Sequence, residues 1–117
     1  MDSILTSIKK MLGITEEYTH FDTDLIMHIN SVFTILTQLG VGPKSGFRIE
    51  NVANTWNEFI QDDDPRYESV KSYLYLKVRL LFDPPLNSAV IDSINRMAGE
   101  LEWRLNIESE EEGNQNG

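Results

Sequence analysis

The residues from Pro65 to Phe82 form a predicted helix that is apolar on almost every side. The apolar residues do not gather on a single stripe: they are Val70, Tyr73, Leu74, Leu76, Val78, Leu80, Leu81 and Phe82. Such a helix belongs in the centre of a fold or of an assembly, because few of its sides can face water without exposing apolar surface. Asp83-Pro84-Pro85 then ends the helix, since consecutive prolines restrict the backbone and cannot continue it. We expect these three residues to form the structural turn that leads to the next helix.

A second long helix is predicted from about Asn87 to Glu108, with Asn87 or Ser88 as its cap. One narrow apolar stripe contains Val90, Ile94, Met97, Leu101 and Leu105, with Ala98 beside it. At about 100° per residue, Trp103 and Ile107 project to nearly the opposite side of this helix. The sequence leaves two alternatives open for that second face. Either the first helix or the segment Phe47–Ile60 covers it, or Trp103 is exposed and anchors a contact between proteins.

Three shorter helices are expected before these two, at about Ser3–Leu12, Thr23–Leu39 and Asn51–Ile60. Asp22 or Thr23 is the expected cap of the second helix, and Asp64 is the expected cap of the helix that starts at Pro65. Val41–Ile49 contains several glycines and is predicted to be a loop, with a short extended segment near 47–49. The predicted class is therefore all-α: a single small helical domain over residues 1–107, with two long C-terminal helices joined by a Pro-Pro turn.

Composition narrows the classes of function. Ten Lys and Arg against nineteen Asp and Glu give a net charge of −9, whereas tight binding to duplex DNA needs clustered basic residues. The chain has no cysteine, which excludes disulfides, thiolate metal sites and a cysteine nucleophile. No stretch approaches the roughly 18 apolar residues of a membrane span. Residues 108–117 are acidic, polar and rich in Gly and Asn, so we expect a disordered tail.

The sequence offers two weak candidates for a metal site. His20, Asp24 and His28 are spaced by four residues, as ligands on one helix face often are, but the predicted helix begins after His20. Asp62-Asp63-Asp64 lacks the spaced ligands and the glycine of a calcium loop, and we expect a solvated turn near a helix N-terminus. No Ser/His/Asp arrangement and no phosphate-binding loop is readable. We therefore predict no catalytic, cofactor-binding or metal-binding residues, and no enzyme.

Two runs of residues in the C-terminal half resemble a known family. They are Tyr75-Leu76-Lys77-Val78-Arg79-Leu80-Leu81-Phe82-Asp83-Pro84-Pro85 and Glu100-Leu101-Glu102-Trp103-Arg104-Leu105-Asn106, and they resemble the head–tail connector (adaptor, or head-completion) proteins of tailed bacteriophages. The resemblance covers Val70 to Ile107. It implies an all-helical virion subunit that forms a homo-oligomeric ring below the portal protein and offers a surface to the next tail-proximal connector or stopper protein. DNA would pass through the channel of this stack without sequence-specific binding, and the family implies no enzymatic role.

A subunit of this kind would use its two long helices for contacts. The expected interface residues are Tyr73, Tyr75 and Arg79 on the first of them, and Trp103 and Ile107 on the second. Two other hypotheses remain. The acidity is compatible with a small protein-binding module or an inhibitor that mimics nucleic acid, although mimicry needs an ordered array of carboxylates. An enzyme would have to use the cluster of His20, Asp24 and His28, which depends on a bound metal.

Overall fold

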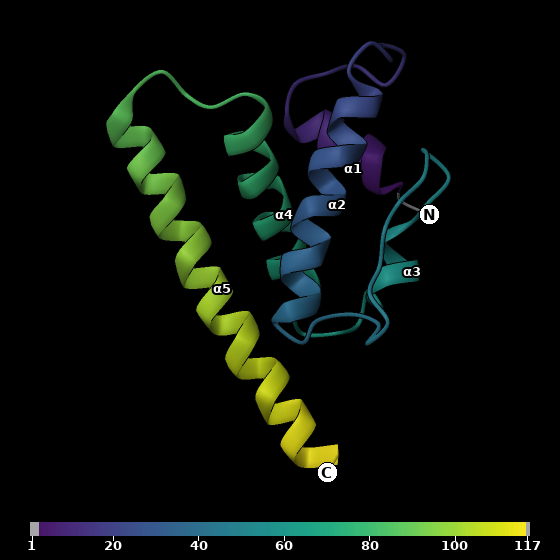
Figure 1. Cartoon of the computed structure of the whole chain (residues 1–117), viewed down its shortest axis with the longest axis vertical. Helices are drawn as coiled ribbons and strands as arrows, with labels where there is room; N and C mark the ends of the chain where they lie inside the picture. The colour runs from purple at the N-terminus through teal and green to yellow at the C-terminus, as the bar shows by residue number, and fades with distance from the viewer. Residues whose placement is uncertain (1–2, 117) are drawn as a thin grey trace.

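The computed structural model describes residues 3–116, and the side chains of residues 3–110. This part of the chain contains five helices and no β-strand (Figure 1): α1 (Ile4–Met11), α2 (Asp22–Gln38), α3 (Trp56–Phe59), α4 (Tyr67–Phe82) and α5 (Ser88–Asn116). The predicted all-α class, with two long helices at the C-terminal end, is confirmed. Across the described helices, none combines the length and the apolar character that crossing a membrane requires.

The centre of the fold is α4, which packs against α2 on one side and against α5 on another (Figure 1). Its Val70, Tyr73, Leu74 and Val78 are buried. Near its C-terminal end Leu81 is 51% exposed, because α5 diverges from α4 at that end of the molecule (Figure 1). The prediction that the most apolar helix lies in the centre is confirmed.

The turn before α4 is built around a buried arginine. Asp64 accepts hydrogen bonds from the backbone N–H of Arg66 at 2.8 Å and from its guanidinium at 3.0 and 2.8 Å. Arg66 Nη1 also donates to Ser109 Oγ at 2.9 Å, which clasps α5 to the start of α4. The expectation that Asp64 occupies the N-cap position is wrong, since α4 begins at Tyr67 with Arg66 at the N-cap, and the Asp64 carboxylate bonds to the N–H of Arg66 just before the helix. These hydrogen bonds from Arg66 lower the pKa of Asp64, although partial burial opposes them.

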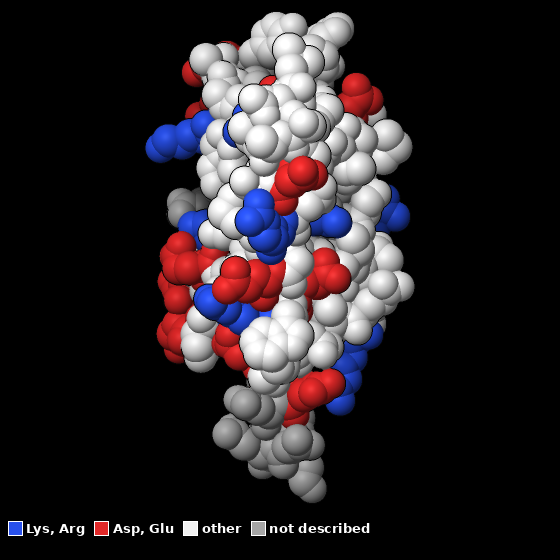
Figure 2. Space-filling view, turned by 90° about the vertical axis from the view of Figure 1, so that its left-hand side faces the viewer, with Lys and Arg blue, Asp and Glu red and all other residues white. Residues whose placement is uncertain are grey.

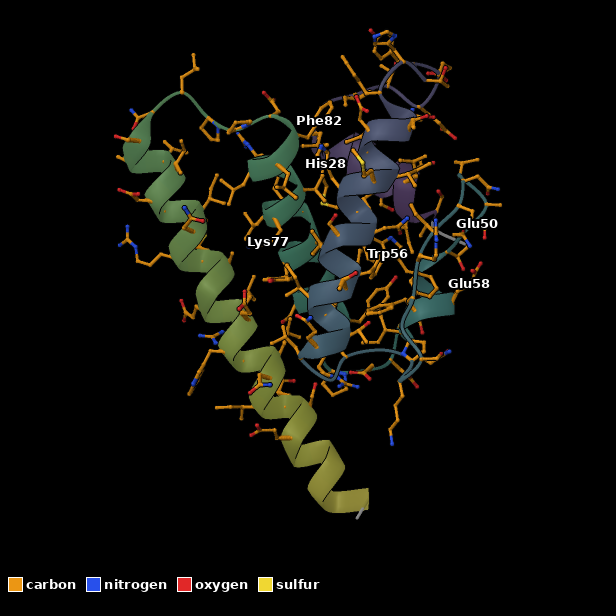
Figure 3. All side chains as sticks on the ribbon, in the orientation of Figure 1. His28, Glu50, Trp56, Glu58, Lys77 and Phe82 are labelled. Carbon is orange, nitrogen blue, oxygen red and sulfur yellow. The ribbon has the colours of Figure 1, made fainter. Side chains whose placement is uncertain are left out.

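The largest part of the core lies between α2 and the segments around α1 and α3. Trp56 is buried there (Figure 3), and its Nε1 donates a hydrogen bond to Ser7 Oγ at 3.0 Å. Phe33, Phe47 and Phe59 pack ring against ring, with centroids 5.0, 4.6 and 5.3 Å apart. Buried aromatic side chains of this kind dominate the energetics of a core. This region therefore supplies much of the apolar burial that holds the chain folded.

The start of α2 differs from the expectation. The helix begins at Asp22, with Phe21 at the N-cap position and no side-chain capping bond, so the predicted cap at Asp22 or Thr23 is wrong. The Asp22 carboxylate instead lies 2.9 Å from the ammonium group of Lys9, a buried residue of α1. Lys9 also donates to the carbonyl oxygen of Glu16 at 3.0 Å. Pairing with the buried cation thus takes the place of capping and joins α1 to α2.

The segment before α3 also differs, since α3 is much shorter than the helix predicted over residues 51–60. The side chains of Asn51 and Asn54 accept hydrogen bonds from backbone N–H groups of this segment, at 2.8 and 2.7 Å, and such bonds hold the chain in turns. The helix starts only after Thr55, where Thr55 and Glu58 form a capping box. Val52, at the start of the range predicted to be helical, lies in these turns and is 52% exposed.

In the loop Val41–Ile49, the last piece, residues 47–49, belongs to no strand, and the short extended segment expected there stays a prediction. Asn30 of α2 holds this piece with two hydrogen bonds, accepting from the Ile49 N–H at 2.7 Å and donating to the Ile49 carbonyl oxygen at 3.0 Å. Phe47 and Ile49 pack into or against the core, and the residue between them is exposed. The side-chain amide of Asn30 thus takes the part that a neighbouring strand would play.

The last helix is longer than predicted. The sequence suggested an end near Glu108 and disorder over 108–117, but the described backbone is helical to Asn116, and Gly117 lies outside the described residues. Glutamate is a good helix former, and the bond between Ser109 and Arg66 fixes the helix past the expected end. We therefore describe residues 108–116 as a continuation of α5.

Only part of the predicted apolar stripe of α5 is packed. Ile94, Ala98 and Leu105 are buried, whereas Val90 and Met97 are 43% and 48% exposed. The reason is the divergence of α5 from α4 toward the start of α5 (Figure 1), so that the apolar side chains of its first turns are covered only in part. The stripe identified the apolar side of the helix, but the angle between the helices decides how much of it is covered.

Candidate interaction surfaces

The outer side of α5 carries an exposed tryptophan. Trp103 is 65% exposed, Ile107 is half-buried, and Gly99 lies one turn before Trp103. No neighbouring atom lies within 4 Å of the position that a Cβ on Gly99 would take. Neither α1 nor the segment 47–60 covers Trp103. Of the two alternatives that the sequence left open, the structure therefore has the exposed one.

The face around α5 divides into a charged and an uncharged part. Figure 2 shows Asp, Glu, Lys and Arg side chains intermixed over its middle and lower part, whereas the upper part is mostly uncharged. Arg104 and Glu100 form an ion pair of 2.7 Å on this helix, with both side chains more than half exposed. Exposed pairs at this spacing add only about 0.3–0.5 kcal/mol to helix stability. These charges therefore add little to the stability of the fold, and their main effect is on the charge pattern of the surface.

A groove of about 440 Å³ opens on another side of α5, where α1 and α4 approach it. Its apolar lining includes two methionines and a tyrosine, and Glu100 and Arg104 are its charged members. The lining residues are Met11, Ser72, Tyr75, Leu76, Met97, Glu100, Leu101 and Arg104. The Tyr75 hydroxyl accepts a hydrogen bond from Arg79 Nη1 at 3.1 Å. Of the expected interface residues, Tyr75 lines this groove, and Arg79 is bonded to it.

Tyr73 lies on a different side of α4. Its side chain is fully buried, and its hydroxyl donates a hydrogen bond to Glu102 Oε2 of α5 at 2.7 Å. Burial, followed by the hydrogen bond to the Glu102 carboxylate, raises the pKa of Tyr73 far above its usual value. Tyr73 therefore serves the packing of α4 on α5, and a partner could reach it only if this contact opened.

The connection between α4 and α5 forms an apolar end of the molecule. Asp83-Pro84-Pro85 follows directly after α4, where the sequence predicted the helix to stop. Leu86 is fully exposed, and Leu81 and Val90 on either side of the connection are 51% and 43% exposed. Asn87 caps α5, because its Oδ1 accepts from the N–H groups at the start of the helix, the shorter bond measuring 2.8 Å. This end therefore presents apolar side chains on a backbone whose turn is well defined.

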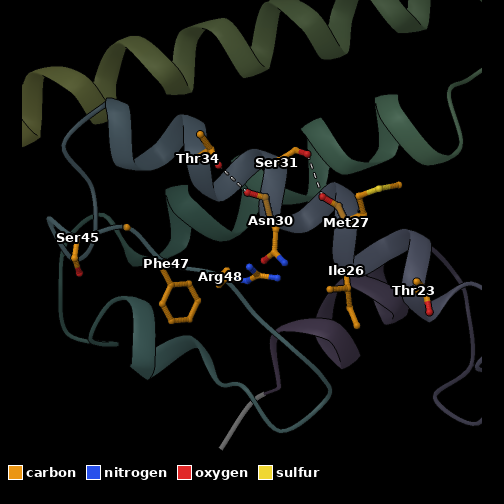
Figure 4. Close-up of a pocket in the computed structure, with 10 residues that line it drawn as sticks. Thr23, Ile26, Met27, Asn30, Ser31, Thr34, Ser45, Phe47 and Arg48 are labelled. Carbon is orange, nitrogen blue, oxygen red and sulfur yellow. Dashed lines mark hydrogen bonds between the residues drawn. The ribbon is translucent and has the colours of Figure 1, made fainter.

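A second groove, of about 790 Å³, lies between α2 and residues 45–48 (Figure 4). The hydroxyl groups of Ser31 and Thr34 along it are turned to backbone carbonyl oxygens of α2, at 3.1 and 3.2 Å. The amide of Asn30 is bonded to Ile49. Small-molecule sites usually have a few polar groups that converge on the ligand. Asn30, Ser31 and Thr34 bond to the protein itself, so these three polar groups are not directed at a ligand in the groove.

The candidate metal ligands are not brought together. His20 lies outside the helix, as predicted, and packs its ring 4.9 Å from the ring of Phe21. His28 is on α2, where its ring lies 6.4 Å from that of Phe82 (Figure 3), and Asp24 is exposed. Within the described side chains, no group of three or more His, Cys, Asp or Glu could hold a metal ion.

The fold and its surfaces define a small helical protein whose exposed features are suited to contacts with other proteins. The family model of the phage connector protein matches residues 4–112, so the chain belongs to the phage connector protein family. The match begins in α1 and ends in α5, well beyond the two C-terminal runs that carried the resemblance. Neither a curated protein nor a solved structure matches the chain. Membership implies a structural component of a phage particle that contacts other head or tail proteins.

Proposed function

We propose that this chain is a subunit of a head–tail connector ring, which docks on the portal protein and offers an attachment surface to the next tail-proximal protein. The observation that carries the proposal is Trp103, which is 65% exposed on the longest helix while the other tryptophan, Trp56, is 1% exposed. Tryptophan is enriched among the residues that dominate binding energy in interfaces. A structural subunit has a use for such a side chain at its surface, and the proposed role involves no catalysis.

A ring subunit needs separate surfaces for its neighbour in the ring and for the component that lies above or below it. We propose Tyr75, Arg79, Trp103 and Ile107 as contact residues, since all four keep at least part of their side chains accessible. The apolar end around Leu86 is a further surface, which lies just before the start of α5 and about four helical turns from Trp103. Two separate apolar surfaces on one small chain support a role between two partners.

The turn Asp83-Pro84-Pro85 would set the relative position of these surfaces. Proline fixes the backbone angle φ and restricts the residue before it, and Asp83 departs from helical geometry with φ −145° and ψ 67°. We propose that this turn holds α5 at its angle to α4, so that Trp103 and the apolar end keep a constant separation. Its role is structural, in the fold and in the ring.

The net negative charge of the chain is compatible with a position beside DNA to which the chain does not bind. A net charge of −9 opposes adhesion to phosphates, because binding depends on clustered Lys and Arg. We propose that acidic side chains border the channel, through which DNA passes without sequence-specific binding. A structure of the assembled ring tests this point, and a channel wall lined by basic residues would contradict it.

The central experiment is native mass spectrometry of the full chain, alone and mixed with the portal protein of the same phage. We expect a complex with a fixed number of copies of this chain per portal. Light scattering over a range of concentrations would show whether the free chain also associates. A chain that stays monomeric throughout and ignores the portal would contradict the proposed function.

A further inference from the structure

We infer that the groove lined by Met11, Tyr75 and Met97 receives Trp103 of a second copy of this chain. The inference rests on the proposed ring and names the contact between neighbouring subunits. It starts from two separate observations: an exposed tryptophan without a cover, and an apolar groove of about 440 Å³ without an occupant, on different sides of the same helix.

The chemistry of the groove suits an aromatic side chain. Thioether sulfurs make favourable contacts with aromatic rings, and Met11 and Met97 of the lining are 39% and 48% exposed. Tyr75 offers a further aromatic surface. Arg104 also lines the groove. A guanidinium group stacks well on the face of an indole. The exposed indole of Trp103 has the shape and chemistry that such a lining accepts.

The surroundings of Trp103 favour close approach of another chain. Gly99 lies on the same side of α5, and glycine is unfavourable in the interior of a helix. Nothing inside the molecule explains it, because the space that its Cβ would fill is open. A neighbouring subunit that seats Trp103 in its groove would pass close to this bare stretch of helix. The position of Gly99 is thus consistent with a second copy that packs closely against this side of α5.

Both surfaces carry charges of both signs. The groove has the ion pair of Arg104 and Glu100 in its lining, and Arg79 is bonded to the Tyr75 hydroxyl beside it. On the other surface, Arg96 and Glu110 lie two turns before and after Trp103 on the same side of the helix. Two copies that each carry a charge of −9 repel one another overall. A small apolar contact, in which Glu110 of one copy can face Arg79 of the other and Arg96 can face Glu100, is therefore a favourable way for them to meet.

The relative position of the two surfaces determines the type of assembly. Counted at about 100° per residue, Trp103 is about 110° around α5 from the mean direction of the residues that α5 contributes to the groove. A protein whose donor and acceptor surfaces differ forms head-to-tail contacts, which repeat from copy to copy and close into a ring when the rotation permits. The inferred contact is thus of the kind that a ring requires.

The test uses two variants of the full chain that damage opposite sides of one contact. Trp103→Ala removes the inserted side chain, and Met97→Glu places a charge in the groove. We expect each variant alone to weaken self-association by at least about tenfold, as loss of a dominant interface residue does. In a mixture, the intact groove of the first can accept the intact tryptophan of the second. Sedimentation velocity should then show a restored heterodimer that grows no further.

Met27→Glu is the matched control, since Met27 is a methionine that is 59% exposed on α2, outside the groove. It should associate like the unchanged chain, and circular dichroism should show all variants folded. A mixture as weak as either variant alone would overturn the inference, and so would an equal effect of Met27→Glu.

The same variants are also tested on the portal, which gives a readout even if the free chain is monomeric. We expect Trp103→Ala and Met97→Glu to reduce the number of copies bound per portal, and their mixture to recover part of it. If both variants bind the portal in the unchanged number, the inference fails while the proposed function stands. If the unchanged chain does not bind the portal at all, the proposed function fails.

Discussion

The region of α1 to α3 and the helix α5 use their apolar residues in opposite ways. In the first region, Trp56 and Phe33 are almost completely buried, and polar groups such as Lys9 and Asn30 are bonded within the fold. On α5 one side is packed, and the other carries Trp103 at 65% exposure. The same residue type, tryptophan, thus stabilises the core in one region and stays open to solvent in the other.

The two regions are therefore expected to serve different properties of the protein, the stability of the folded chain and its association with other chains. Side chains that hold the chain together lie in the first region and between α4 and its two neighbours, whereas α5 contributes only part of its surface to this core. Changes in the first region should therefore lower the free energy of unfolding. Changes on the outer side of α5 should leave it nearly unchanged and affect association instead.

The largest expected effect contrasts the two tryptophans. Trp56→Ala should lower the free energy of unfolding by about 3–5 kcal/mol, because it leaves a cavity in the core. Trp103→Ala should change it by no more than about 0.5 kcal/mol, as surface substitutions usually do. Urea unfolding followed by circular dichroism measures both. A loss of several kcal/mol in Trp103→Ala would mean that Trp103 belongs to the core after all.

A smaller effect is expected at a glycine of the first region. Gly42 has φ 84°, and a Cβ there would collide with the ring of Phe59. Gly42→Ala should cost about 2–4 kcal/mol, from the left-handed backbone and the overpacking together. Gly46→Ala is the control, with φ 92° and no atom nearby, and it should cost only the backbone part, about 1–2 kcal/mol. Equal losses in urea unfolding would show that the Phe59 ring moves aside freely.

The next effect has the opposite sign and lies on α5. Gly99→Ala should raise the free energy of unfolding by about 0.5–1 kcal/mol, since alanine favours the helix and meets no neighbouring atom. The same variant should associate more weakly, because its methyl group occupies space that a second copy would approach. Thermal unfolding and sedimentation velocity measure the two properties. If the variant is more stable and associates as strongly as the unchanged chain, then Gly99 does not lie in the contact between copies.

The smallest effect concerns the turn before α4 and depends on pH. The pKa of Asp64 in the folded state is lower than its ordinary value of 3.8. A lowered pKa contributes stability that is present above pH 3.8 and is lost as the pH falls through the folded-state value. Asp64→Asn should therefore be less stable than the unchanged chain near neutral pH, and the difference should shrink below about pH 4. Urea unfolding at several pH values checks this, and a constant difference would contradict it.

Much of the architecture was predictable from the spacing of apolar residues and from the helix stops. The central place of α4, its end at Phe82 and the cap at Asn87 all follow from local chemistry. The projection of Trp103 away from the packed side of α5 follows in the same way from helical periodicity. These predictions concern single helices, for which the sequence carries the information directly.

The other predictions failed, or could not be made, because they depend on how elements meet. Periodicity placed Val90 and Met97 on the apolar side of α5, but the angle at the connection leaves them exposed. The helix expected over residues 51–60 was shortened by side-chain bonds of Asn51 and Asn54 to the backbone. The groove needs Met11 beside Met97, and no pattern in the sequence relates two residues so far apart.

The clasp between Arg66 and Ser109 has a mechanical consequence. Helix α5 is attached to the rest of the fold on both sides of Trp103, by the short connection after α4 and by Arg66 at Ser109, and between these points Tyr73 of α4 bonds to Glu102. A force applied at Trp103 is shared by these attachments and passes into α4, the central helix of the core. A neighbour that pulls on this side chain would therefore load the central helix of the fold instead of separating the last helix from it.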